Sequence, residues 1–183
     1  MRSPPTNKRL VPSDAGLLGT WFHEHRGIFE KVARSFGRGE TEVGELRQEM
    51  LYQLWLALPR FAGQSKPSTW VYRVCLNTAL TWRRGTDRRE RRIEPGHDFE
   101  AVAAQTHSPA ESVEAGERLE QLYAALRAMP ETDRALLMLM LDGLDYREIA
   151  EVTGMTENHV GVALTRARRR LVAQMKGVVD ELG

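Results

Sequence analysis

The stretch 145–171, which reads DYREIAEVTGMTENHVGVALTRARRRL, constrains the fold of this chain more than any other. Asp145 and Glu148 have the spacing of a capping box, which predicts the start of a short helix. Gly154 predicts the end of that helix, because glycine accepts the left-handed backbone that follows a helix terminus. Thr156 is placed to cap a second helix. The stretch therefore predicts a helix-turn-helix.

The second of these helices has one apolar and one basic face. Its apolar residues recur at steps of four, three and four, which is the period of one helical stripe: Val160, Leu164, Ala167 and Leu171. The outer face is polar and basic and consists of Asn158, His159, Thr165, Arg166, Arg168, Arg169 and Arg170. Because a helix-turn-helix places the start of its second helix in the major groove, this face indicates DNA binding. The alternative is an αα-hairpin with a solvated basic face.

Helical periodicity also governs the rest of the chain, and no strand-like alternation extends beyond a few residues. Residues 93–107 have no periodicity and contain Pro95 and Gly96, after which Ser108 and Glu111 have a capping spacing again. We therefore expect an all-α fold of two small helical domains joined by a flexible linker. The expected segments are a disordered N-terminal tail (1–12), a first lobe (13–85), a linker (86–107), a second lobe (108–177) and a C-terminal tail (178–183).

Charge and cysteine content narrow the class of protein. The 26 Lys and Arg residues against 25 Asp and Glu residues leave a net charge of +1, so any DNA affinity must come from local clusters. Cys75 is the one cysteine, which excludes an internal disulfide and favours a reducing compartment, here the cytoplasm. No apolar run approaches the roughly 18 residues of a spanning helix. We therefore expect no membrane insertion.

An arginine-rich run follows the last helix of the first lobe and has two interpretations. It consists of Arg83, Arg84, Arg88, Arg89, Arg91 and Arg92, with Asp87 and Glu90 between them. The run is either a solvated helix end whose cations complement the helix dipole or a patch that follows DNA phosphates.

Signatures of catalysis are weak in this sequence. Gly37 and Gly39 lack the third glycine and the preceding strand of a phosphate-binding loop. His23 and His25 are two residues apart on a predicted helix, so they point to different faces and form a poor metal pair. We expect no catalytic residue, no metal site and no cofactor.

Three stretches, taken in order, resemble a known family. They are ELRQEMLYQLW (45–55), RFAGQSKPSTWVYRVCLNTALTWRR (60–84) and ALRAMPETDRALLMLMLDGLDYREIAEVTGMTENHVGVALTRARRRL (125–171). They are similar to the polymerase-clamp helix, the promoter-melting segment and the fourth domain of bacterial sigma factors of the extracytoplasmic-function (ECF) group. These members of the sigma-70 family retain only the second and fourth sigma domains. The resemblance implies a non-enzymatic transcription initiation factor.

For the first lobe, the resemblance implies two surfaces. The surface that would dock on the polymerase consists of Glu45, Gln48, Glu49, Leu51 and Trp55. The surface for the minus-ten element and its melting would consist of Gly63, Gln64, Ser65, Lys66, Ser68, Arg73, Asn77, Arg83, Arg84, Arg88 and Arg89. Within it, the loop 63–68 would receive an unstacked base of the non-template strand. Trp70 is expected to anchor this loop as a core aromatic residue rather than to stack on a base.

For the second lobe, the resemblance implies recognition of the minus-thirty-five element. The residues concerned are Thr156, Glu157, Asn158, His159, Val162, Arg166 and Arg169. Asparagine suits adenine and an apolar side chain suits the thymine methyl, whereas Arg166 and Arg169 would hold phosphates. Many family members carry lysine and arginine early on this helix, where this chain has Gly161 and Ala163.

The partners implied by the resemblance are core RNA polymerase, through its β′ clamp helices and β flap, promoter DNA and an anti-sigma factor. Three alternatives stay open from the sequence alone. The first is a stand-alone helix-turn-helix regulator that needs no polymerase contact. The second is a sigma-like decoy that binds an anti-sigma protein and no promoter, and the third is a small helical enzyme.

Overall fold

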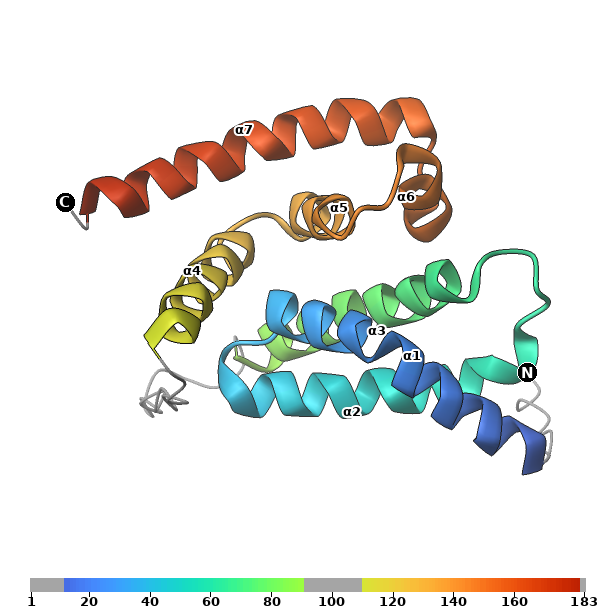
Figure 1. Ribbon diagram of the computed structural model, residues 1–183. Coiled ribbons are helices and arrows are strands. Elements are labelled where there is room, and N and C mark those ends of the chain that lie inside the picture. Colours follow the sequence, from blue (N-terminus) through green and yellow to red (C-terminus); the bar gives the residue numbers. More distant parts are fainter. Residues whose placement is uncertain (1–11, 91–109, 182–183) are drawn as a thin grey trace.

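Every secondary-structure element in the described part of the chain, residues 12–90 and 110–181 of a computed structural model, is a helix (Figure 1). This confirms the predicted all-α class. The predicted linker lies outside the described residues from residue 91 onward, and so does the predicted N-terminal tail up to residue 11. None of the described helices is long and apolar enough to cross a membrane.

The first lobe is a bundle of three long helices, α1 (Pro12–Phe36), α2 (Gly39–Ala57) and α3 (Pro67–Glu90), with the short 3-10 helix η1 (Leu58–Arg60) after α2. Each long helix packs against the other two. Phe29, Leu46, Met50 and Val71 are among the residues at their common core. Cys75 is buried there too, and burial raises the pKa of its thiol, as expected for an inert core cysteine.

Two local features shape this bundle. Helix α1 is kinked at His25 (φ −111°, ψ 15°), two residues before Gly27. At the turn into α2, a Cβ atom on Gly37 would lie 2.9 Å from the backbone nitrogen of Val43. Only glycine therefore lets α1 and α2 approach this closely. Helix α3 continues to Glu90, past the position 85 at which we expected the first lobe to end.

The second lobe contains α4 (Ala110–Arg127), α5 (Glu131–Leu141), α6 (Tyr146–Thr153) and α7 (Glu157–Glu181). The predicted capping box is confirmed: the Glu148 N–H donates to the Asp145 carboxylate at 2.7 Å, and the Asp145 N–H donates to Glu148 at 3.1 Å. Gly154 has the expected left-handed backbone (φ 76°). The His159 N–H donates to the Thr156 hydroxyl at 3.3 Å. The predicted helix-turn-helix of α6 and α7 is therefore confirmed.

The two lobes pack against one another. Helix α3 contacts α6, and α1 contacts α4 and α5. In Figure 1, α5 and α6 lie between α7 and the first lobe. The start of α7 therefore faces away from the helices of the first lobe, whereas α6 faces toward them.

Arg134 occupies a buried position at the junction of α4 and α5. Its guanidinium donates to the carbonyl oxygens of Leu126, Arg127 and Met129 at 2.9, 2.7 and 3.0 Å. The same group lies 4.9 Å from the ring centroid of Phe36 at the end of α1. Arg134 therefore satisfies the carbonyl groups where α4 ends, and it also contacts the first lobe.

Candidate nucleic-acid interface

Three aromatic side chains anchor the loop between η1 and α3 where it joins the helices. Phe61 and Trp70 flank the loop, and both pack edge-to-face on Trp21 of α1, with ring centroids 4.8 and 5.7 Å away. Phe61 and Trp70 also contact each other, at 5.3 Å. This confirms the expectation that Trp70 anchors the loop as a core aromatic residue. The sequence alone did not indicate that Trp21 anchors this loop.

The loop itself is open to solvent. Gly63 has a left-handed backbone (φ 70°), which turns the chain outward. Gln64 and Lys66 are exposed, and Ser65 and Ser68 are half-buried. The predicted loop residues therefore lie together at one end of the first lobe.

Four polar residues continue from this loop along a single face of α3. Arg73, Asn77, Arg84 and Arg88 are separated by steps of four, seven and four, and all four are exposed. Between α2 and this face lies a groove of about 630 Å³, which is lined by Asn77 together with Gln53 and Trp82, among others. The stripe follows the loop along the chain. We call the two together the minus-ten surface; it comprises loop 63–68, Arg73, Asn77, Arg84 and Arg88.

Arg83 is not on this surface, although the sequence reasoning grouped it with the surface arginines. Its side chain is only 4% exposed, and it pairs with Glu42 of α2 at 3.2 Å and with Asp87. The Arg83 Nε–H donates to the Asp87 carboxylate at 2.8 Å. Arg83 therefore holds α3 against α2. The backbone of Arg89 lies within α3, and its side chain is outside the described part of the structure.

Lys66 has an acidic partner in the other lobe. Its ammonium group donates to the Glu148 carboxylate at 2.7 Å. The hydrogen bond to Glu148 raises the pKa of Lys66, and the same bond lowers the pKa of Glu148. Both shifts favour the charged forms of the pair.

The outer face of α7 presents the residues predicted to read DNA bases. All of them are exposed: Thr156, Glu157, Asn158, His159, Val162, Arg166 and Arg169. Val162 is 72% exposed and lines a shallow hollow together with Thr165 and three arginines of the same face. The face therefore combines an apolar contact with basic groups around it.

Gly161 and Ala163 have different surroundings. A Cβ atom on Gly161 would lie 3.4 Å from the ring of Tyr146, which is an ordinary van der Waals distance, so this position has room for a small side chain. Ala163 is 2% exposed. The burial of Ala163 accounts for the absence of a basic residue at that position, because burying an unpaired charge is costly.

A buried carboxylate on α5 organises the arginines of α7. Asp133 is 1% exposed; it pairs with Arg166 at 3.7 Å and also with Arg170. Asp133 was not singled out from the sequence, where it lies among the polar residues 131–134 that begin α5, ahead of its apolar stretch. Arg166 therefore has a structural ion pair in addition to its exposed position.

A second candidate surface runs along α2. Glu45 and Gln48 are exposed, and the same face continues with Tyr52 and Leu56, which are 50% and 45% exposed. Leu51, Trp55 and Glu49 are half-buried, and the Glu49 carboxylate accepts from the Gln53 amide at 2.8 Å. Tyr52 and Leu56 were not singled out in the sequence, although their steps of four after Gln48 place them on one stripe.

Two protein-family models and a relative of known function match this chain. The model for Sigma-70 region 2 matches residues 21–89, and the model for Sigma-70, region 4 matches residues 119–171. The ECF RNA polymerase sigma-E factor of Escherichia coli (strain K12) is 30% identical over 160 residues, which cover 81% of this chain and 80% of that protein. This chain belongs to the ECF sigma factors.

A second relative is also a sigma factor, and two solved structures have the same fold. RNA polymerase sigma factor NccH of Alcaligenes xylosoxydans xylosoxydans is 26% identical over 172 residues, which cover 92% of each chain. Two solved structures share the fold. CnrH in complex with the cytosolic domain of CnrY has a TM-score of 0.64 at 21% identity and covers 89% of this chain and 90% of that one. The sigma factor RpoE in complex with the anti-sigma factor NepR from Bartonella quintana has a TM-score of 0.67 at 20% identity, with coverages of 91% and 98%.

The ECF sigma factor described here is thus a transcription initiation factor that directs RNA polymerase to promoters, and it belongs to a non-enzymatic family. Region 2 lies in the first lobe, and region 4 contains α5, α6 and the first part of α7. The stand-alone regulator and the small enzyme, which the sequence alone left open, do not agree with this membership.

Proposed function

We propose that this sigma factor divides promoter recognition between its lobes. The minus-ten surface would contact and melt the minus-ten element, and the start of α7 would read the minus-thirty-five element. The observation that carries the proposal is the alignment of Arg73, Asn77, Arg84 and Arg88 on one exposed face of α3 that continues from the loop. Cations along one helix face suit successive phosphates, whereas an amide among them suits a base edge.

Melting in this proposal needs no hydrolysis of fuel. Extruding one base from a duplex costs a few kcal/mol, and a fitted pocket for that base offsets it. The loop 63–68 supplies serine hydroxyls and the Gln64 amide to bind such a nucleobase. The aromatic cluster of Trp21, Phe61 and Trp70 holds the loop in place. A preorganised loop loses less conformational entropy on binding than a mobile one.

We further propose that the exposed stripe of α2 docks on the β′ clamp helices of core RNA polymerase in the cytoplasm, and that the second lobe contacts the β flap. The stripe Glu45, Gln48, Tyr52 and Leu56 combines a charge, an amide and two exposed apolar side chains. Large exposed apolar residues bordered by polar ones are typical of protein interfaces. Tyr52 is the residue of this stripe best suited to be an energetic hot spot.

Run-off transcription with core polymerase tests the docking assignment. Wild-type protein is expected to produce transcripts, whereas the Glu45→Lys/Tyr52→Ala variant should bind core polymerase about thirtyfold more weakly, a loss of about 2 kcal/mol. Glu24→Lys, at an exposed position on α1, is the matched charge reversal and should bind like wild type. A pull-down measures binding and circular dichroism checks the fold. Undiminished binding by the double variant would remove α2 from the polymerase interface.

We also propose that an anti-sigma protein binds this chain. Both solved neighbours are complexes: CnrH is bound to the cytosolic domain of CnrY, and the sigma factor RpoE is bound to the anti-sigma factor NepR. Purification of the chain at its native level from its own host is expected to bring a second small protein with it, identified by mass spectrometry. Repeated recovery of the chain alone, or only with polymerase, would contradict this proposal.

A further inference from the structure

A buried carboxylate at the start of α5 faces two arginines of α7. Asp133 lies in the first turn of α5, which packs against α7, and its side chain is only 2% exposed. The Arg170 guanidinium donates a hydrogen bond to the Oδ2 atom of Asp133. A guanidinium nitrogen of Arg166 lies 3.7 Å from the Oδ1 atom. The two oxygens of one buried carboxylate therefore face two different arginines of the recognition helix.

The two arginines contact Asp133 in different ways. Arg170 donates a hydrogen bond, so it satisfies the buried charge and joins α7 to α5. The 3.7 Å between Arg166 and Asp133 is longer than the about 2.7–3.2 Å of an N–H···O hydrogen bond. The carboxylate therefore attracts Arg166 without using its N–H groups at hydrogen-bond distance. Because the Arg166 side chain is 59% exposed, these N–H groups are accessible to a phosphate.

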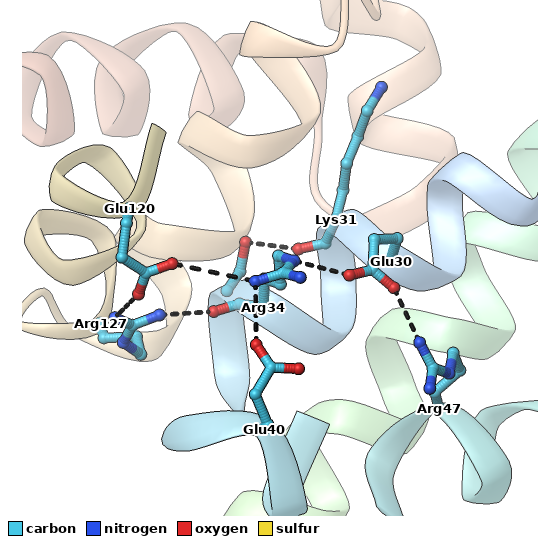
Figure 2. A network of polar contacts seen from close by, with 8 residues as sticks. Glu30, Lys31, Arg34, Glu40, Arg47, Glu120 and Arg127 are labelled. Atoms are coloured by element: carbon cyan, nitrogen blue, oxygen red, sulfur yellow. Dashed lines mark hydrogen bonds and ion pairs between the residues drawn. The ribbon is translucent and has the colours of Figure 1, made fainter. Parts of the chain in front are cut away.

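Ion pairs at the surface of this chain differ from the one at Asp133. Figure 2 shows the Glu120 carboxylate of α4, which pairs with Arg34 at 3.9 Å and with Arg127 at 2.6 Å. The Glu120 side chain is 55% exposed, so water and salt screen its charge. Asp133 is shielded from solvent, and its attraction for arginine is screened much less. A buried carboxylate is therefore suited to fix the direction of an arginine that is itself exposed.

We propose that Asp133 is a positioning residue for recognition of the minus-thirty-five element, because it directs Arg166 toward a backbone phosphate. This inference rests on the proposed role of α7. A long side chain that is ordered before binding loses less conformational entropy when the phosphate binds. Phosphate contacts also fix the register of a protein on the duplex. The direction of Arg166 consequently determines which base pairs lie opposite Asn158 and Val162.

A purely structural role for Asp133 leads to different expectations. A carboxylate in the first turn of a helix interacts favourably with the helix dipole, and the pair with Arg170 joins two helices. In that case the effect of replacing Asp133 on DNA binding does not depend on Arg166. Removal of a negative charge near DNA by itself strengthens binding to phosphates, whereas loss of positioning weakens it.

The first test replaces Asp133 by asparagine, which removes the charge and keeps the shape of the side chain. The probe is a fluorescent duplex that wild-type holoenzyme, the chain bound to core polymerase, selects from a pool of random minus-thirty-five sequences. Asp133→Asn should bind this duplex about fivefold more weakly, because Arg166 is then ordered only on binding. The matched control is Glu120→Gln, which also removes a carboxylate that pairs with two arginines and should bind like wild type.

A double-mutant cycle tests whether Asp133 acts through Arg166. In an Arg166→Ala background, in which Arg170 still pairs with the carboxylate, Asp133→Asn should cause no further loss of affinity. In an Arg169→Ala background the loss should remain about fivefold. Arg169 lines the same hollow, but in the described part of the chain it is not an ion-pair partner of Asp133. An equal loss in both backgrounds overturns the positioning role.

A measurement on the wild-type chain makes the test independent of how well the variants fold. Nitrogen relaxation of the arginine Nε–H groups, measured by NMR, should show that Arg166 is more ordered than Arg169. Asp133→Asn should lower the order of Arg166, and Glu120→Gln should leave it unchanged. Equal order of the two arginines in the wild-type chain overturns the proposal even where Asp133→Asn does not fold.

Failure of the proposed function gives a different result. If Arg166→Ala and Arg169→Ala both bind the selected duplex like wild type and with an unchanged salt slope, α7 does not hold phosphates and its proposed role is wrong. If Arg166→Ala weakens binding but the order of Arg166 does not depend on Asp133, the proposed function stands and the positioning role alone is wrong.

Discussion

Replacing Arg134 by alanine is expected to lower the free energy of unfolding by about 3 kcal/mol, because three carbonyl groups at the end of α4 lose their shared donor. The Arg134 residue is 7% exposed, and its contacts to Leu126, Arg127 and Met129 lie between 2.7 and 3.0 Å. Burial lowers the pKa of Arg134, which reflects the desolvation that these hydrogen bonds offset. Loss of the cation also removes its contact with the Phe36 ring.

Urea unfolding followed by circular dichroism measures this loss. Arg134→Lys is expected to lie between wild type and alanine, since an ammonium group lacks the planar fork that reaches several acceptors at once. Arg147→Ala, on the exposed face of α6 in the same lobe, is the control and should stay within about 0.5 kcal/mol of wild type. An Arg134→Ala stability equal to that of this control would show that the buried guanidinium does not hold the junction of α4 and α5.

Asn158→Ala is expected to lose about 1–3 kcal/mol of promoter binding and to relax the preference at one base pair of the minus-thirty-five element. The side chain is exposed in the first turn of α7, where side chains of a recognition helix reach base edges. Arg88→Ala is the matched contrast, because an exposed cation on the stripe of α3 is expected to contact phosphate. It should weaken binding to all promoters about equally and lower the salt slope by about one.

Promoter binding by the holoenzyme across a salt series separates these two effects. In the same experiment, permanganate footprinting of unpaired thymines reports opening, and substitutions at Gln64 and Lys66 should reduce the footprint more than the affinity of the closed complex. If the footprint survives the loop substitutions but disappears with Asn158→Ala, the second lobe melts the promoter and the assignment of melting to the first lobe is wrong.

The helix-turn-helix could be predicted from the sequence because its determinants are local. The capping box joins residues three apart, Gly154 acts through its own backbone, and the stripe from Val160 to Leu171 depends only on helical period. Interactions within one or two turns are encoded by spacing alone. The same reasoning places Arg73, Asn77, Arg84 and Arg88 on one face of α3. The spacing of residues does not indicate what each surface would bind; that expectation came from the resemblance to ECF sigma factors.

Tertiary structure decided the features that depend on partners far along the chain. Arg83 and Arg84 are adjacent arginines, yet Arg83 is buried because Glu42, 41 residues earlier, faces it from α2. The pairing of Lys66 with Glu148 spans 82 residues. The sequence does not show which charged residue pairs with which, because the free energy of an ion pair depends on distance and burial, and packing determines both. For the same reason, only the packed chain reveals that α6 lies next to Lys66 and Arg73.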